Sequence, residues 1–430
     1  MKYFFYNRRT LAIIAVVWFF CMIFYIKWNK YDALISDPGA YIYYAKLCAE
    51  QGTMYPNTSL LHSSYIFNPG WVNFIVLWIN IFGSVRYLVY MNAFFNIAIL
   101  SLIYVLCRRL FANCNIAYTA AYMYMILPSF FTISNHTFSE LYFILWSLLA
   151  LYFAVRGGKW TYVAGLASAL AMWTRPIALG WLVACLFWFL WKRYDWCCTV
   201  RYIASYVIVC ALVAVCTHRD YPDYVYKANT GGVNLIMGAN DHATGQYCVE
   251  AFNPVDGLGY IEYPEKYTVN QKDSIWKQRA IQWIIQHPKT YVWLTVKKLF
   301  QLYIVAPSFT YTYKSLPEGR YSSSSVYDKM ETAYPFNLQG IWQNQAFLCF
   351  HFHIAIMLLS LFGLFRYARK KRELCMLYIP IILCTAMTIA TVGAPRYNVV
   401  MLPLIIMTAA YTLHCSIQYF FPNRGKAKMS

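Results

Sequence analysis

Long apolar stretches separated by short polar segments set the pattern of this chain. Several runs of about 17 to 22 residues carry almost no charge, which is the length that a helix needs to cross the hydrocarbon core of a bilayer. The pattern therefore predicts an all-α polytopic membrane protein with about ten transmembrane helices, within a range of about 9 to 12. We expect these helices at residues 11–26, 87–106, 116–134, 140–155, 160–174, 177–191, 200–216, 345–365, 374–393 and 398–419.

One further apolar run, residues 71–82, is only about 12 residues long and too short for a full crossing. If it did cross, Arg108 and Arg109 would lie on the outer face, and the charge pattern downstream would invert. We therefore expect a re-entrant or interfacial helix that starts after the NPG turn at residues 68–70.

This arrangement divides the chain into three parts. Residues 1–216 form an N-terminal transmembrane module, whose first outer loop (27–86) is expected to carry the chemistry. Residues 217–343 form a large outer loop with interfacial helices, including an amphipathic helical stretch broken at His287-Pro288. Residues 344–430 supply the C-terminal transmembrane helices and a short basic tail.

Composition and charge agree with a membrane protein. The chain is 60% hydrophobic and 12% charged, which is more apolar surface than a soluble enzyme of 430 residues could bury. The predicted cytoplasmic segments hold 18 of the 36 Lys and Arg residues but only two of the 17 acids, Asp195 and Glu373. This positive-inside pattern places both termini in the cytoplasm. The net charge of +19 is therefore expected to face membrane lipids, and nucleic acid is not expected as a partner.

The stretch ISDPGAYIYYAKLCAEQG follows the first span and carries an acid in a turn. Pro38 restricts φ and Gly39 relaxes it, so Asp37 is expected just before a short helix at the membrane surface. Asp37 is either a simple helix cap or a catalytic acid on the outer face. Tyr41 and Lys46 on the same predicted helix are candidate substrate-binding residues.

Three other outer turns carry ionisable residues close to the ends of apolar spans. Glu140 lies in SNHTFSELY, Arg175 in WTRPIALG, and Arg396 precedes Tyr397 in VGAPRY. Charged groups at that depth are costly unless they are paired or face a cavity, so these four residues are candidates for substrate binding. The structural alternatives are a helix start at Glu140 capped by Ser139 or Thr137 and an interface arginine at position 175.

The remaining candidates come from the second outer loop. Asn240 and Asp241 lie in GGVNLIMGANDHATG, a stretch suited to close approach of the backbone, and both are candidate substrate-binding residues. The chain has 14 cysteines, of which Cys48 and Cys248 fall in outer loops, where a disulfide between them remains open. The cysteine spacing predicts no metal site, and no cofactor is expected with certainty, although a divalent metal remains open.

An acid and two arginines on one membrane face suit a reaction at a lipid phosphate. Arginines bind a phosphate bidentately as it gains charge in leaving, and a carboxylate can accept the proton of an attacking hydroxyl. The sequence has no P-loop, no dinucleotide-binding glycine pattern and no catalytic Ser-His-Asp order. A donor that is already embedded in the membrane therefore fits better than a soluble nucleotide.

The chain resembles the C-superfamily membrane glycosyltransferases, which include protein O-mannosyltransferases and the bacterial aminoarabinose transferase of lipid A. The resemblance covers nearly the whole length and rests on the order and spacing of several motifs. They are DPGAYIYYA, NPGW, RRLF, SELYF, GLASALAMWTRPIAL, GGVNLIMGANDHATG, WIIQHPKTY and APRYNVVMLP.

This resemblance implies inverting transfer of a sugar from a polyprenyl-phosphate donor to an acceptor hydroxyl or phosphate. Asp37 would be the catalytic aspartate of the first outer loop, and Arg396, with Arg175, would lie near the lipid phosphate. The small size of the protein is that expected of an enzyme in a bacterial inner membrane, and its site would face the periplasm. Pro38 replaces the second acid of the mannosyltransferases, which leaves the sugar and the acceptor open. The alternatives are a transporter or flippase of lipid-linked glycans and a polysaccharide polymerase or ligase.

Overall fold

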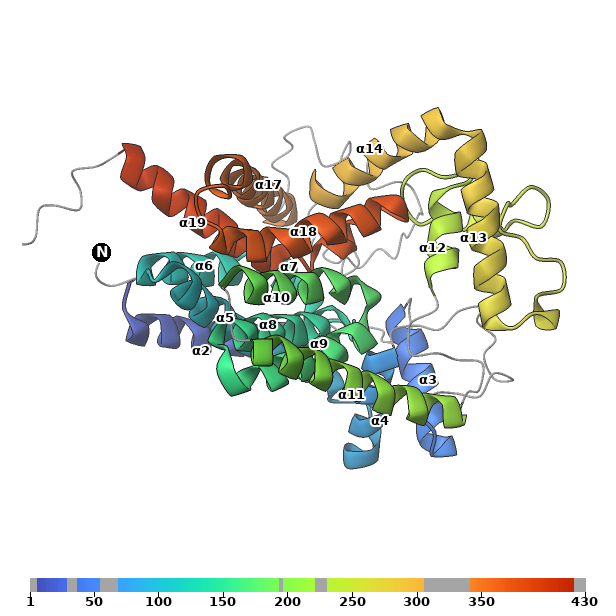
Figure 1. Ribbon diagram of the computed structural model, residues 1–430, viewed down its shortest axis with the longest axis horizontal. Helices are drawn as coiled ribbons and strands as arrows, with labels where there is room; N and C mark the ends of the chain where they lie inside the picture. Colours follow the sequence, from blue (N-terminus) through green and yellow to red (C-terminus); the bar gives the residue numbers. More distant parts are fainter. Residues whose placement is uncertain are drawn as a thin grey trace, which may run out of the picture.

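The described part of the protein is entirely helical. The computed structural model describes residues 6–28, 37–54, 69–192, 196–220, 230–304 and 341–420, and within these ranges it contains α-helices and 3₁₀ turns but no strand. The basic C-terminal tail beyond Phe420 lies outside the described residues. The prediction of an all-α protein is confirmed for the part of the chain that is described. In Figure 1 most of the long helices run roughly along the long axis, whereas α3 (Asp37–Gln51), α4 (Pro69–Phe82), α12 (Gly231–Gly238) and α13 (Val269–Gln286) run across it.

Eleven helices in the described ranges build the bundle that occupies the left and centre of Figure 1. They are α2 (Arg8–Trp28), α5 (Met91–Phe111), α6 (Cys114–Ile126), α7 (Pro128–Ile133), α8 (Glu140–Arg156), α9 (Thr161–Thr174), α10 (Leu179–Lys192), α11 (Trp196–Asp220), α17 (Ile341–Tyr367), α18 (Glu373–Ala390) and α19 (Leu402–Phe420).

Five more helices lie toward the right of the same view. They are α3 (Asp37–Gln51), α4 (Pro69–Phe82), α12 (Gly231–Gly238), α13 (Val269–Gln286) and α14 (Pro288–Ile304). Two features agree with the expectation from the sequence. Residues 69–82 form the short helix α4, and the helical stretch of the second outer loop is broken at His287, between α13 and α14. The expected span 116–134 is instead two helices, because Pro128 interrupts the backbone hydrogen bonding between α6 and α7.

Four helices among the described residues are long and apolar enough to cross a membrane. They cover Arg8–Trp28, Leu88–Phe111, Trp196–Cys216 and Glu373–Ala390. All four helices also expose large apolar side chains on the surface of the bundle: Phe20 and Phe24 are each 63% exposed, Phe94 is 55%, Leu212 is 62% and Ile382 is 51% exposed. Contiguous surfaces of this kind are unfavourable in water and suit hydrocarbon.

Small residues allow the bundle helices to approach closely. Gly165 of α9 faces Tyr202 of α11, where an added Cβ would lie 2.2 Å from the Tyr202 carbonyl oxygen and 2.0 Å from Ser205 Oγ. Ser168, one turn further along α9, shares a buried 2.8 Å hydrogen bond with the Tyr202 hydroxyl. Such small-residue contacts and buried side-chain hydrogen bonds are how helices associate in an apolar solvent.

Residues 230–304, here called the α12–α14 unit, have a small apolar core of their own. Its centre is Val233 and Ile236 of α12 packed on Trp276 and Trp283 of α13. A capping box starts α13, with the Thr268 and Gln271 side chains each bonded to the other's backbone. In Figure 1, α13 lies across the end of the bundle, unlike the helices within it.

Helix α14 attaches this unit to the turn that follows α18. Lys298 is fully buried and donates a 2.8 Å hydrogen bond to the carbonyl of Gly238, at the end of α12. Burial lowers the pKa of Lys298 to about 8. Gly393 lies directly against Lys298, where an added Cβ would be 2.5 Å from the lysine Cα, and the Gly393 amide donates to the carbonyl of Gly245. These contacts therefore fix the position of the α12–α14 unit relative to the turn that follows α18.

We predict that Gly165→Ala destabilises the fold by about 1–3 kcal/mol, because the new methyl group would overlap a backbone carbonyl that cannot move without shifting α11. Denaturation of the purified protein in bicelles by SDS, followed by tryptophan fluorescence, measures the change. Gly231→Ala is the matched control, since its methyl group would meet no backbone atom closely, but the flexible end of Lys277 at 3.2 Å and Asp273 Oδ1 at 4.0 Å. Equal stability of the two variants would contradict the packing described.

Candidate functional site

Four ionisable side chains from distant parts of the chain meet in one cluster. Arg396 is at its centre: its Nε donates to Glu140 Oε1 and its Nη1 to Asp37 Oδ2, each at 2.5 Å. Arg175 Nη1 lies 3.0 Å from the same Glu140 oxygen. Two acids and two arginines, which we call the arginine–carboxylate cluster, are thus joined by three charged contacts. The grouping of Asp37, Glu140, Arg175 and Arg396 agrees with the expectation that they share one site.

Local backbone structure places each of the four at the end of an element. Asp37 and Glu140 are the first residues of α3 and α8, where the helix dipole favours negative charge. Arg175 has an extended backbone between α9 and the turn that begins at Pro176, because a residue before proline is disfavoured in a helix. Arg396 lies in the 3₁₀ turn Pro395–Asn398, directly before α19. Every one of these side chains therefore leaves a helix end and not a helix side.

The cluster is buried unevenly. The Glu140 side chain is 0% exposed, Arg175 and Arg396 are 11% and 16% exposed, and Asp37 is 37% exposed. A carboxylate as deeply buried as Glu140 needs compensating cations, and the two arginines supply them. Glu140 therefore anchors both guanidinium groups, while Asp37 is the member of the cluster that solvent or a ligand can reach.

Two tyrosines adjoin the cluster. Tyr41 is one turn along α3 from Asp37 and is 1% exposed, and Tyr397 follows Arg396. Burial raises the pKa of both hydroxyls above the ordinary tyrosine value, and the nearby Asp37 adds to this effect. Both tyrosines therefore stay protonated and can serve as neutral hydrogen-bond donors beside the charges.

Phe138 is a component of the cluster that the sequence analysis missed. Its ring lies against the Arg396 guanidinium, with the Cζ atom 3.9 Å from the ring centroid, in a cation–π contact. Phe138 comes only two residues before Glu140, in the stretch SNHTFSELY. The position of an aromatic residue in a polar turn was the available signal, but its partner could not be read from the sequence.

The segment that leads to Glu140 is held by buried polar contacts from other helices. The Asn92 amide donates to the carbonyls of Ser134 and His136, at 3.0 and 2.8 Å, and the Trp71 indole donates to the Thr137 carbonyl at 2.9 Å. Asn92 is 1% exposed on α5, so its amide satisfies carbonyls that would otherwise be unpaired. These contacts fix the backbone immediately before Glu140.

Helix α4 supports the other side of the cluster. Gly70 lies so close to the end of α9 that an added Cβ would be 2.9 Å from the Thr174 backbone nitrogen. Near this contact, the Trp173 indole donates a 2.7 Å hydrogen bond to Asn73 Oδ1. The short helix thus braces the residues directly before Arg175.

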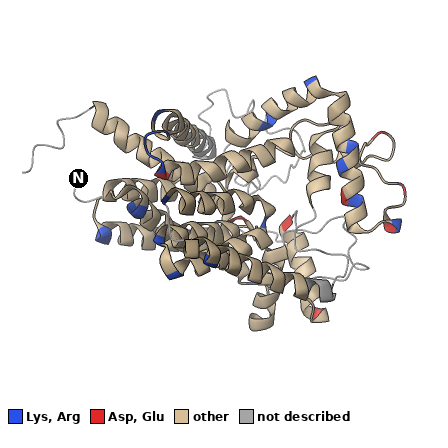
Figure 2. Cartoon of the chain, in the orientation of Figure 1, with Lys and Arg blue, Asp and Glu red and all other residues tan. Residues whose placement is uncertain are grey.

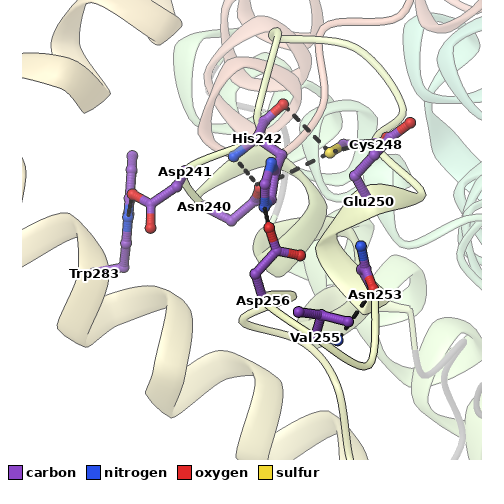
Figure 3. A network of polar contacts seen from close by, with 9 residues as sticks. All are labelled: Asn240, Asp241, His242, Cys248, Glu250, Asn253, Val255, Asp256 and Trp283. Atoms are coloured by element: carbon purple, nitrogen blue, oxygen red, sulfur yellow. Dashed lines mark hydrogen bonds and ion pairs between the residues drawn. The ribbon is translucent and has the colours of Figure 1, made fainter.

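Three of the candidate residues lie outside the arginine–carboxylate cluster. Lys46 is exposed on α3, nine residues after Asp37, or about 13 Å along the helix. Asn240 and Asp241 belong to the turn after α12, shown in Figure 3, where they organise the α12–α14 unit. Asn240 bonds the carbonyls of Ile236 and Met237, and Asp241 accepts a 2.7 Å hydrogen bond from the Trp283 indole.

The structure also decides between alternatives that the sequence left open for Glu140, Arg175 and the two outer-loop cysteines. Ser139 is the residue before α8, but its side chain makes no capping hydrogen bond, and Thr137 Oγ1 is buried without a hydrogen-bond partner among the described residues, so neither residue supplies the cap considered as the alternative for Glu140. Arg175 is paired with Glu140 and only 11% exposed, unlike an arginine that extends to the membrane surface. Cys48 and Cys248 are buried in different apolar clusters and do not form the disulfide considered above.

A divalent metal finds no ready set of ligands in the described part of the chain. Within the described ranges, no group of three or more His, Cys, Asp or Glu residues could hold a metal ion. In the arginine–carboxylate cluster, Arg396 and Arg175 contact Oε1 of Glu140, and Arg396 also contacts Oδ2 of Asp37.

In its described part the protein is helical, with four helices long and apolar enough to cross a membrane and with a largely buried charge cluster. No protein-family model matches the sequence, and no curated protein matches it either.

We predict that Glu140→Gln lowers the free energy of unfolding by about 3–5 kcal/mol, because it leaves two buried arginines without their shared anion. SDS denaturation in bicelles measures the loss. Glu50→Gln, at an exposed acid on α3, is the control and should change stability by less than about 0.5 kcal/mol. If the two variants were equally stable, Glu140 would not be the anchor of the cluster.

Proposed function

We propose that the protein is an integral-membrane glycosyltransferase that moves a sugar from a polyprenyl-phosphate donor to an acceptor. One observation carries the proposal: Arg396 contacts both a deeply buried and a partly exposed carboxylate at one end of an apolar helical bundle. Arginine next to an accessible acid is the pair that phosphate departure and proton transfer require. The resemblance of the sequence motifs to the C-superfamily transferases points to the same reaction.

In this reaction Asp37 accepts the proton of the acceptor hydroxyl, while the acceptor oxygen forms a bond to the anomeric carbon of the sugar. The bond between that carbon and the phosphate oxygen breaks on the opposite side, which inverts the configuration. The leaving polyprenyl phosphate keeps the electron pair, and Arg396 and Arg175 balance the charge that develops on it. Tyr41 and Tyr397 supply neutral hydroxyls that orient the sugar or the phosphate.

The same proposal includes the membrane topology. About ten helices cross the membrane, both termini are in the cytoplasm, and the arginine–carboxylate cluster faces the periplasm of a bacterial inner membrane. The distribution of charge supports this orientation: in Figure 2 most acidic residues lie toward the end of the bundle where α3, α12 and α13 are found. Basic residues at the opposite helix ends match the positive-inside rule.

The sugar and the acceptor are left open by this proposal, and a polymerase or ligase of lipid-linked glycans would use the same chemistry. A transporter or flippase is the alternative of a different class. Transporters place polar and discontinuous helices near the bilayer midplane. The arginine–carboxylate cluster instead connects helix ends at one end of the bundle, which favours an enzyme.

We predict that Asp37→Asn lowers sugar transfer at least about 100-fold, because asparagine keeps the shape of the side chain but cannot accept the proton. The protein should remain at normal abundance in the membrane. Mass spectrometry of glycolipids extracted from cells that carry this variant should show accumulation of one polyprenyl-phosphate sugar, which identifies the donor.

Glu50→Gln is the matched control for this experiment, because it removes an exposed acid from the same helix. It should leave the glycolipid profile of the wild type unchanged. Full transfer activity in Asp37→Asn would rule out the assignment of Asp37 as the base.

A further inference from the structure

The two carboxylates that Arg396 holds are not equivalent. We propose that Asp37 occupies, before substrate binds, the position on Arg396 that the donor phosphate takes in the complex. Binding of the donor, whose phosphate is a diester between the prenyl chain and the sugar, then displaces Asp37 and frees its carboxylate for the acceptor hydroxyl, and the phosphate monoester that leaves after transfer occupies the same position. This inference rests on the proposed function and assigns the phosphate position within the same site.

Glu140 cannot be the carboxylate that gives way. It is 0% exposed, and a single oxygen, Oε1, contacts both Arg396 Nε and Arg175 Nη1. Its displacement would leave a buried anion and two cations without partners, which is among the costliest changes in an apolar interior. The hydrogen bond between Arg396 and Glu140 therefore stays in place when phosphate binds.

Asp37 is bound in a way that an incoming anion can replace. Its described contact within the cluster is a single hydrogen bond from Arg396 Nη1, and its side chain is 37% exposed. Ion pairs with this degree of exposure contribute little net stability, because water competes for both partners. The donor phosphodiester offers two non-bridging oxygens to a guanidinium, where Asp37 uses one carboxylate oxygen, and the phosphate monoester that leaves offers three oxygens and a higher charge.

The surroundings of Arg396 restrict where the phosphate can approach. The Phe138 ring covers one face of the guanidinium, with the Cζ atom 3.9 Å from the ring centroid. Nε is bound to the buried Glu140 and Nη2 is itself buried, so the hydrogen-bonding position that a phosphate can reach is the one at Nη1, beside the partly exposed Asp37. Arg175, joined to the same Glu140 oxygen, adds a second positive charge beside that position. A phosphate therefore competes with Asp37 and not with Glu140.

The competition between Asp37 and phosphate for Arg396 predicts an unusual result when this catalytic base is replaced. Loss of the Asp37 charge should strengthen phosphate binding while it abolishes transfer, since the internal competitor is gone. We expect Asp37→Asn to bind farnesyl phosphate about three- to tenfold more tightly than the wild type does. Farnesol, which has the same chain without phosphate, should bind both proteins equally.

The test uses the full-length protein in nanodiscs of zwitterionic lipid, with dissociation constants from calorimetry for farnesyl phosphate, farnesol and inorganic phosphate. Glu50→Gln should match the wild type for all three ligands. Arg396→Gln should lose the preference for farnesyl phosphate over farnesol. Inorganic phosphate should show the same gain in Asp37→Asn but bind more weakly than the prenyl compound, because it lacks the chain.

Equal or weaker farnesyl phosphate binding by Asp37→Asn would overturn the inference. Binding of inorganic phosphate as tight as that of farnesyl phosphate would overturn the assignment to a lipid phosphate. If the wild type did not distinguish farnesyl phosphate from farnesol, the proposed function itself would fail. The binding measurements thus separate failure of the inference from failure of the proposed function.

Discussion

The Arg396 guanidinium is the interaction on which the rest of the structure depends. Arg396 lies in the turn before α19 and binds both Asp37 and Glu140, which are 359 and 256 residues away along the chain. In an apolar bundle such charges are tolerated only when they neutralise one another, so the position of each element that carries one is constrained by the others. The starts of α3 and α8, the end of α9 and the turn before α19 must therefore converge.

The surrounding structure can be understood as support for this convergence. Asn92 and Trp71 hold the segment before Glu140, and α4 braces the end of α9 through Gly70. The α12–α14 unit packs on the turn that carries Arg396, through Lys298 and Gly393. Each support acts on backbone next to a charged residue, so small changes in these contacts are transmitted directly to the geometry of the cluster.

The α12–α14 unit shows why a polar motif is weak evidence for catalysis. Asn240 and Asp241 stand in a stretch rich in glycine and polar residues, which is typical of ligand-binding loops. In the structure their side chains instead bond the carbonyls at the end of α12 and the indole of Trp283. A turn that is packed on a helix end needs side chains to pair its backbone, and Asn240 does so, while Asp241 connects the turn to α13 through Trp283.

The sequence alone determined the helical class, the short α4, the break at His287 and the candidate charges, because apolar runs, proline positions and isolated ionisable residues are local features. Only the tertiary structure decided that Glu140 is the buried anchor, that Asp37 is the accessible acid and that Phe138 covers Arg396. It also separated Lys46, Asn240 and Asp241 from the cluster. Pairing and burial depend on how elements far apart in the chain pack together, and no pattern within one segment records that arrangement.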